Sequence, residues 1–139
     1  MPEESTTPDL VELVQRGFEA VNRRELDAIL SAFVSDAVWE AAPLGVSFEG
    51  VAAIRGFFEG WIGSYEEFAM EPEEVLDLGN GVVFSVCLQR GRPLGSTGVV
   101  GVRSGFVMVL VGGLIAQVTA YVDIDEARAA AERLAEERG

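Results

Sequence analysis

The sequence predicts an α+β domain in which helices come first and a sheet of antiparallel strands follows. The N-terminal half carries apolar stripes at helical spacing, interrupted by one short strand, whereas after residue 66 the apolar side chains follow strand spacing. Tight turns at Gly79-Asn80-Gly81 and at Gly112-Gly113 separate the later strands. Helices followed by a run of hairpin-connected strands are typical of α+β folds.

Three helices are expected before the sheet. The first should begin at Thr7-Pro8-Asp9, with a hydroxyl cap, proline at the first helical position and an acid in the first turn, and it should end near Asn22. A short second helix follows, and the third runs from about Val51 to Tyr65. The apolar faces consist of Leu26, Ile29, Leu30 and Phe33 in the second helix, and of Ile54, Phe57, Phe58, Trp61, Ile62 and Tyr65 in the third.

The third helix also carries three glycines, Gly56, Gly60 and Gly63, on the face opposite its aromatic residues. We favour the interpretation that this face is open to solvent. The alternative is close approach by a second backbone, which would offset the cost of about 1 kcal/mol that each glycine carries relative to alanine.

A short strand, Ala37-Val38-Trp39-Glu40-Ala41, lies between the second and third helices, and the rest of the chain is predicted to cover or extend it. Successive side chains of a strand point to opposite faces of the sheet. If Trp39 faces the interior, Glu40 therefore points away from it. Asp36 is expected to cap the turn into this strand.

The strands after residue 66 are predicted to form a meander. Pro72 interrupts the first of them, which indicates an edge position or a bulge. Later strands are almost continuous in apolar residues, so both faces of the sheet should be covered. Helices would cover one face and a partner subunit the other. We therefore expect a homodimer through the convex face, with Val99, Val107 and Tyr121 in the interface.

Composition excludes several classes of function. A chain of 139 residues forms one domain with a buried core. Its 23 acidic and 10 basic residues give a net charge of −13, which repels nucleic acids and anionic membranes. No apolar run could cross a bilayer, and the start of the chain lacks the features of a signal peptide, so we expect a cytoplasmic protein.

Missing residue types narrow the chemistry further. Because the chain contains no histidine and no lysine, it offers no imidazole base, no His-ligated metal and no Schiff-base lysine. We expect neither a metal nor a cofactor. The single cysteine, Cys87, lies in an apolar strand pattern and is predicted to be a core thiol rather than a nucleophile.

Acid–base chemistry would have to come from carboxylates, tyrosines or water. Glu40 is the candidate base, because it stands beside Trp39, although strand alternation directs it away from the interior. Asp36 and Asp123 are predicted to cap a turn and the last helix instead. We therefore assign no catalytic residue and keep Glu40 as the one candidate.

Several short segments match a known pattern. They are FEAVN (18–22), LDAIL (26–30), SDAVWE (35–40), FEG (48–50) before AIRGFF (53–58), and GGLI (112–115) through YVD (121–123). In this order the chain resembles the nuclear-transport-factor-2-like superfamily, and within it the SnoaL-like or ketosteroid-isomerase-like branch. The resemblance implies a curved antiparallel sheet wrapped around N-terminal helices, a cystatin-like cone with an apolar pocket.

The resemblance also suggests a division of the chain. Residues 1–8 are predicted to be a disordered tail and residues 9–127 the SnoaL-like cone domain. Residues 128–139 are predicted to extend it as a surface helix, within a helical segment over residues 124–138 that Asp123 caps.

Transferred residue by residue, the catalytic positions of the family hold no catalytic group. The general-base aspartate of the isomerases corresponds to Ala41, the oxyanion tyrosine to Gly17, and the protonated aspartate to Gly105 or Phe106. An acid used by epoxide hydrolases of this fold corresponds to Ala120. We therefore expect no ketosteroid isomerase activity.

The resemblance favours a protein that binds a small apolar or polycyclic molecule in its cone without the usual isomerase residues. Two alternatives stay open: a polyketide-cyclase-like or isomerase-like enzyme that uses an unrecognised carboxylate and water, and a non-catalytic association module with a collapsed cavity. The predicted pocket residues, which would serve equally as plain core, are Trp39, Phe58, Trp61, Val86, Leu88, Phe106 and Val118.

Overall fold

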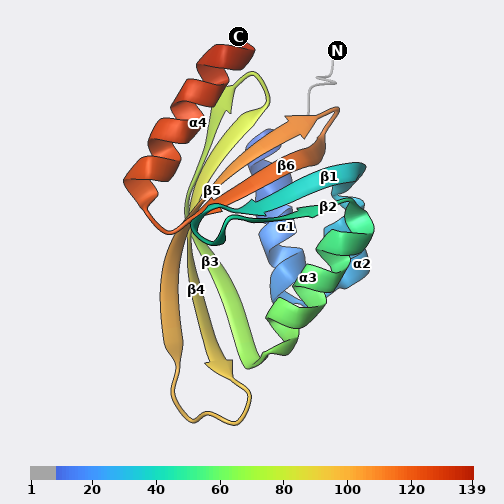
Figure 1. Cartoon of the computed structure of the whole chain (residues 1–139), viewed down its shortest axis with the longest axis vertical. Coiled ribbons are helices and arrows are strands. Elements are labelled where there is room, and N and C mark those ends of the chain that lie inside the picture. Colours follow the sequence, from blue (N-terminus) through green and yellow to red (C-terminus); the bar gives the residue numbers. More distant parts are fainter. Residues whose placement is uncertain (1–8) are drawn as a thin grey trace, which may run out of the picture.

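A computed structural model describes residues 9–139 of the chain (Figure 1). Within this range the elements are α1 (Leu10–Asn22), α2 (Leu26–Ser31), β1 (Phe33–Ala41), the 3₁₀ helix η1 (Ala42–Leu44), β2 (Val46–Glu49), α3 (Val51–Gly63), β3 (Tyr65–Gly79), β4 (Val82–Pro93), β5 (Val100–Val111), β6 (Leu114–Tyr121) and α4 (Ile124–Arg138). The predicted tail, residues 1–8, lies outside the described residues.

The six strands form one sheet in the order β2-β1-β6-β5-β4-β3 (Figure 1). Strands β3 to β6 form the predicted antiparallel meander. Strand β1 pairs antiparallel with β2 but parallel with β6, so the sheet is antiparallel at every pairing except that one. This parallel pairing places the N-terminal strand beside the C-terminal one and brings the two halves of the chain together.

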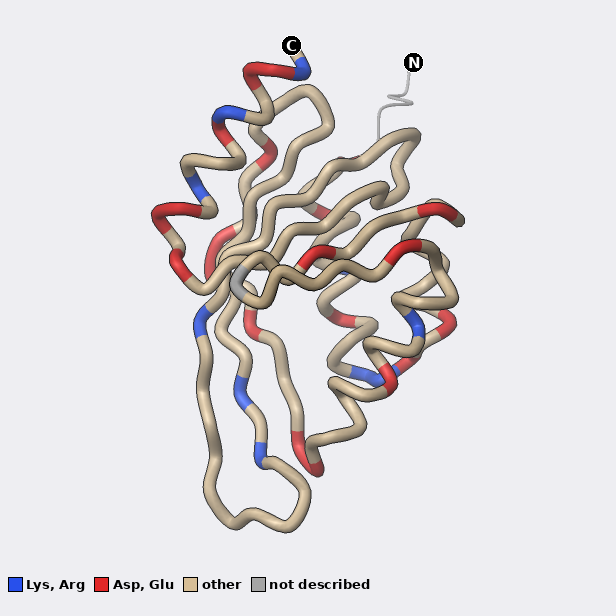
Figure 2. The backbone as a smooth tube through the Cα atoms, viewed as in Figure 1, with Lys and Arg blue, Asp and Glu red and all other residues tan. Residues whose placement is uncertain are grey.

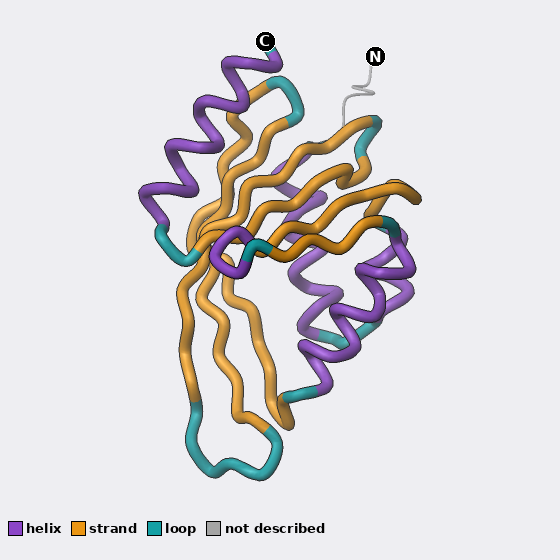
Figure 3. The backbone as a smooth tube through the Cα atoms, in the orientation of Figure 1, coloured by secondary structure: helices purple, strands orange, loops and turns teal. Residues whose placement is uncertain are grey.

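The sheet is strongly curved and does not close, because β2 and β3 remain edge strands. Helices α1, α2 and α3 lie inside the curve, and α4 lies on the outer face (Figures 1 and 3). Register shifts interrupt β3 between Pro72 and Glu74 and the β5–β6 pairing between Val109 and Leu110, and such bulges bend strands. The predicted α+β fold with a curved sheet around N-terminal helices is confirmed.

Two clusters of buried residues follow from this arrangement. The larger fills the concave side, between the sheet and helices α1 to α3. The smaller lies between the convex side of β4 and β5 and helix α4. Its fully or nearly fully buried members are Val82, Phe84, Val86, Val107, Ala127, Ala131 and Ala135.

Helix α1 begins two positions later than its predicted cap implies. Asp9 is the N-cap, and its carboxylate accepts a hydrogen bond from the backbone N–H of Glu12 at 3.2 Å. A capping carboxylate satisfies one of the free N–H groups of the first turn. Asp9 therefore replaces Thr7 in that role, and Thr7 and Pro8 lie outside the described residues.

Strand pairing shortens two helices relative to their apolar patterns. Phe33 opens β1, where it stands opposite Ile115, so α2 ends at Ser31. Tyr65 opens β3 opposite Pro93, and α3 ends at Gly63. Both aromatic residues still pack on the concave cluster. Phe33 and Tyr65 fit the helical spacing although they lie in strands. A strand that follows a helix can direct its first side chains to the same core as the helix.

The predicted turns and the predicted role of Pro72 are confirmed. Asn80 and Gly81 have φ values of 58° and 81°, and Gly112 and Gly113 have 61° and 83°. Positive φ at both central residues is what a two-residue hairpin turn requires. Pro72 lies on the edge strand β3 and next to a bulge, both positions where its missing N–H is tolerated.

Helix α4 is capped as predicted but is less of a surface element than predicted. The Asp123 carboxylate accepts from the backbone N–H of Glu126 at 3.0 Å. Ala127 is completely buried on the sheet, and a Cβ at Gly105 would lie only 2.6 Å from the Ala127 Cβ. The helix thus covers Val107, which is 4% exposed. The prediction that Val107 lines a dimer interface is therefore wrong, because its own chain buries it.

The glycine face of α3 is open. Gly56, Gly60 and Gly63 are all exposed, and a Cβ at any of them would have no neighbour within 4 Å. This confirms the interpretation of a solvent face.

We expect Gly60→Ala to raise the free energy of unfolding by about 0.5–1 kcal/mol, because alanine loses less backbone entropy in a helix and meets no obstacle here. Urea denaturation followed by circular dichroism measures the change. A loss of stability would mean that this face contacts another backbone.

Candidate ligand cavity

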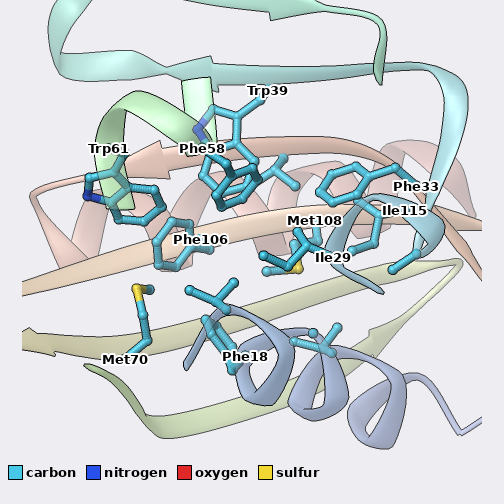
Figure 4. Close-up of a pocket in the computed structure, with 15 residues that line it drawn as sticks. Phe18, Ile29, Phe33, Trp39, Phe58, Trp61, Met70, Phe106, Met108 and Ile115 are labelled. Carbon is cyan, nitrogen blue, oxygen red and sulfur yellow. The ribbon is translucent and has the colours of Figure 1, made fainter. Parts of the chain in front are cut away.

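A cavity of about 50 Å³ lies inside the curve of the sheet, between helices α1 and α3 and strands β1, β5 and β6 (Figure 4). Every side chain that lines it is apolar. The lining residues are Val14, Gly17, Phe18, Val21, Ile29, Ala32, Phe33, Trp39, Phe58, Trp61, Met70, Phe106, Met108, Ile115 and Val118.

Trp39 occupies the centre of one wall. Its indole is 6% exposed, which places it on the concave face as alternation along β1 predicts. The ring centroids of Phe58 and Phe106 lie 5.2 and 6.0 Å from it, both in edge-to-face geometry. Trp61, one turn beyond Phe58 on α3, lies 6.3 Å away. Such aromatic pairs add about 0.5–1.5 kcal/mol each to the energy of burial.

Helix α1 closes the opposite side of the cavity. Val14, Phe18 and Val21 share one face of this helix, and the Phe18 ring stands edge-to-face with Phe106 at 6.2 Å (Figure 4). Gly17 also reaches the lining, and a Cβ there would have no neighbour within 4 Å. A larger side chain at Gly17 therefore has room at this wall of the cavity.

Five of the seven predicted pocket residues line the cavity: Trp39, Phe58, Trp61, Phe106 and Val118. The structure corrects the other two. Val86 packs under α4 on the convex face, and Leu88 shares that side of β4 and is half-buried. Alternation along β4 directs Val83, Ser85 and Cys87 inward instead. The sequence could not decide between these faces because both are buried and both are apolar.

Other lining residues were missed, namely Phe18, Ile29, Phe33, Met70, Met108 and Ile115. A signal for some of them existed in the predicted hairpins. Met108 stands opposite Val118 in the β5–β6 pairing, and residues opposite each other share a face. Met70 gave no such signal, because its place depends on a long bulged strand.

The cavity holds no group that could transfer a proton. Among the described residues, no side chain that lines it is titratable, and the polar groups on these side chains are the indole N–H groups of Trp39 and Trp61. A volume of about 50 Å³ exceeds the roughly 10–15 Å³ that one water needs, but a buried water also needs two to four polar partners. The arrangement therefore suits an uncharged apolar molecule better than water.

Glu40 lies on the other face of β1, away from the cavity. Its carboxylate is within 3.4 Å of the Gln117 amide nitrogen and the Thr119 hydroxyl, which can donate to it. Glu40 and Thr119 border an open groove of about 340 Å³ that also includes Ser47 and Tyr121. The structure thus separates the candidate base from the apolar cavity. Asp36 is exposed within β1 rather than at a helix or turn cap.

The positions transferred from the family divide between the two faces. Gly17 lines the cavity, and Ala41 borders the groove. Phe106 faces the cavity, whereas Gly105 faces α4. Ala120 packs against the concave core.

Cys87 is a buried thiol, as predicted. Burial, followed by the negative charge of Glu73, raises the pKa of the Cys87 thiol to about 12. Since the thiolate is the nucleophile, a thiol with this pKa is unreactive near neutral pH.

Charged side chains lie outside the cavity. Figure 2 shows acidic residues along α4 and on the helices, with arginines on the long β4–β5 hairpin. Arg103 of this hairpin binds Glu73 through two hydrogen bonds of 2.6 and 2.9 Å, which lowers the pKa of the Glu73 carboxyl. Across residues 9–139, no group of three acidic, cysteine or histidine side chains is placed to hold a metal ion.

The helices of residues 9–139 include none with both the length and the apolar content of a membrane span.

The curved sheet, the enclosed helices and the cavity define a protein of the ketosteroid-isomerase-like or nuclear-transport-factor-2-like class. The profile of the SnoaL-like domain family matches residues 14–118. The chain therefore belongs to the SnoaL-like domain family. No curated protein sequence matches it.

Solved structures agree with this fold. A ketosteroid-isomerase-like protein from Catenulispora acidiphila, in complex with trimethylamine, has a TM-score of 0.73 at 17% identity, covering 91% of this chain and 94% of its own. A cystatin-fold protein from Novosphingobium aromaticivorans has a TM-score of 0.72 at 16% identity, covering 82% and 98%. The epoxide hydrolase/cyclase-like enzyme SalBIII has 0.71 at 24% identity, covering 81% and 88%.

We expect alkaline pH to destabilise the wild-type protein more than Cys87→Ala. The folded pKa is raised to about 12 from 9.0, so the stabilisation is complete below pH 9 and is lost as pH rises toward 12. At pH 10 the difference should reach about 1 kcal/mol. Urea denaturation of both proteins at pH 8 and pH 10 measures the loss of stability. An equal loss in wild type and Cys87→Ala would contradict the raised pKa of the Cys87 thiol.

Proposed function

We propose that this protein binds a small, uncharged, apolar molecule in the cavity beside Trp39. The observation that supports the proposal most directly is a cavity lined by aromatic and aliphatic side chains, without a titratable group among the described residues. Dry apolar cavities of this kind take up apolar ligands, because no well-bound water must be displaced.

The size of the cavity favours a small ligand. Its volume of about 50 Å³ is well below the roughly 150 Å³ of an engineered cavity that binds benzene. A one-ring ligand therefore requires modest movement of lining side chains, for which the flexible Met70 and Met108 are suited. A polycyclic ligand would require displacement of several aromatic rings at once. The trimethylamine complex of the Catenulispora protein supports a small ligand for this fold.

The small volume also gives one alternative some support, a non-catalytic association module whose interior is filled by its own side chains. Ligand binding distinguishes the two functions, because a filled interior takes up nothing. A cyclase-like or isomerase-like enzyme would need a carboxylate beside its substrate, and Glu40, the candidate base, lies outside this cavity on the opposite face of β1.

We also propose a homodimer. Its interface differs from the one predicted from the sequence, because α4 covers Val107. Large apolar side chains remain exposed near the groove that contains Tyr121, with Leu44 at 76% and Val46 at 42%, and Val99 at 68% on the long hairpin. Burying such side chains in an interface contributes about 25 cal/mol per Å² of apolar surface.

For the dimer, we expect sedimentation at micromolar concentration to show a species of twice 14.9 kDa. Val46→Glu should shift it toward monomer, because a charge would be buried beside Glu40. Val111→Glu, at an exposed position in the distant β5–β6 hairpin, is the matched control. A wild-type species of 14.9 kDa alone would contradict the dimer.

For the cavity, we expect toluene to quench or enhance the fluorescence of the wild-type protein, because both tryptophans of the chain line the cavity. Gly17→Leu should weaken toluene binding at least 10-fold by adding a side chain to the cavity lining. Gly60→Leu, on the open face of α3, is the control and should bind as the wild type does. Equal affinity in all three proteins would contradict a ligand at this cavity.

A further inference from the structure

Ser85 is a buried polar residue in an otherwise apolar interior. Among the described residues it is the one polar or charged side chain that is buried, with 0% exposure. Its hydroxyl oxygen has no hydrogen-bond partner. A buried hydroxyl without a partner destabilises the folded state, so its presence calls for a physical reason.

The reason lies in the position of Ser85 on the sheet. Ser85 stands directly opposite Phe106 in the β4–β5 pairing, and residues opposite each other share a face with Cβ atoms about 4.5–5.5 Å apart. Phe106 lines the cavity. Ser85 therefore lies on the concave face, one residue outside the present lining.

The cavity can grow in this direction. A ligand larger than about 50 Å³ must displace a lining side chain, and the Phe106 ring is held by edge-to-face contacts with Phe18 and Trp39 rather than by hydrogen bonds. Expansion past this ring reaches β4, where Ser85 presents its hydroxyl opposite Phe106.

We propose that Ser85 is the polar anchor of the cavity, and that the ligand is an apolar molecule with one uncharged hydroxyl or carbonyl oxygen that pairs with the Ser85 hydroxyl. This inference rests on the proposed binding function and specifies its ligand class. A neutral oxygen satisfies the serine without a counter-ion. An anionic ligand is disfavoured, since no cation lines the cavity and the protein carries a net charge of −13.

The test compares phenol with toluene, two one-ring molecules of similar shape that differ in a hydroxyl and a methyl group. Isothermal titration gives the dissociation constants of both probes for wild type, Ser85→Ala and Cys87→Ala. The last is the matched control, because Cys87 is also 0% exposed and lies two residues away on the same face. The preference for phenol over toluene should fall about 5-fold in Ser85→Ala and stay unchanged in Cys87→Ala.

The outcomes separate this inference from the proposed function. If both probes bind and the phenol preference is the same in Ser85→Ala as in wild type, Ser85 does not anchor the ligand. The proposed binding of apolar molecules in the cavity is then still supported. If neither probe binds the wild-type protein, the proposed function fails and the anchor with it.

Stability without ligand supplies a second, independent readout. Ser85→Ala should be at least as stable as the wild type, since it removes an unpaired buried hydroxyl. A larger loss of stability than in Cys87→Ala would show that the hydroxyl serves the fold rather than a ligand, and would overturn the anchor.

Discussion

The packing of aromatic rings around Trp39 is the constraint on which the rest of the structure depends. The β1–β6 pairing places Trp39 opposite Val118, so the indole is fixed to the sheet by backbone hydrogen bonds. From there it contacts rings of α3 and β5, including Phe58 at 5.2 Å and Phe106 at 6.0 Å. A sheet that surrounds side chains of this size must curve, and α3 must lie across its concave face. The cavity is enclosed by these same rings.

A second constraint acts on the convex face, where α4 packs through alanines. The close approach of Ala127 is compatible only with glycine at position 105, because a Cβ there would lie 2.6 Å from the alanine side chain. Phe106 consequently points inward. The two positions that the resemblance associates with a catalytic acid, Gly105 and Phe106, thus pack on opposite sides of β5.

The interior and exterior of this protein have opposite chemical character. Carboxylates and arginines form pairs on the outside, such as Glu73 with Arg103 across the β3–β5 region, and Glu40 faces the outer groove. Inside, the polar side-chain groups at or next to the cavity are the two indole N–H groups and the Ser85 hydroxyl. In surroundings of such low polarity a hydrogen bond is electrostatically stronger than in water.

By itself the sequence determined the order of the elements apart from η1 and β2, the hairpin turns, the edge position of Pro72 and the opposite directions of Trp39 and Glu40. Each of these depends on local periodicity or on backbone conformation, which neighbouring residues specify. Only the tertiary structure decided the parallel β1–β6 pairing, the coverage of Val107 by α4 and the direction of Val86 and Leu88. Strand β4 is apolar on both faces, so alternation alone does not tell which face lies on the concave side of the sheet. The helices that pack on each side of the sheet decide this.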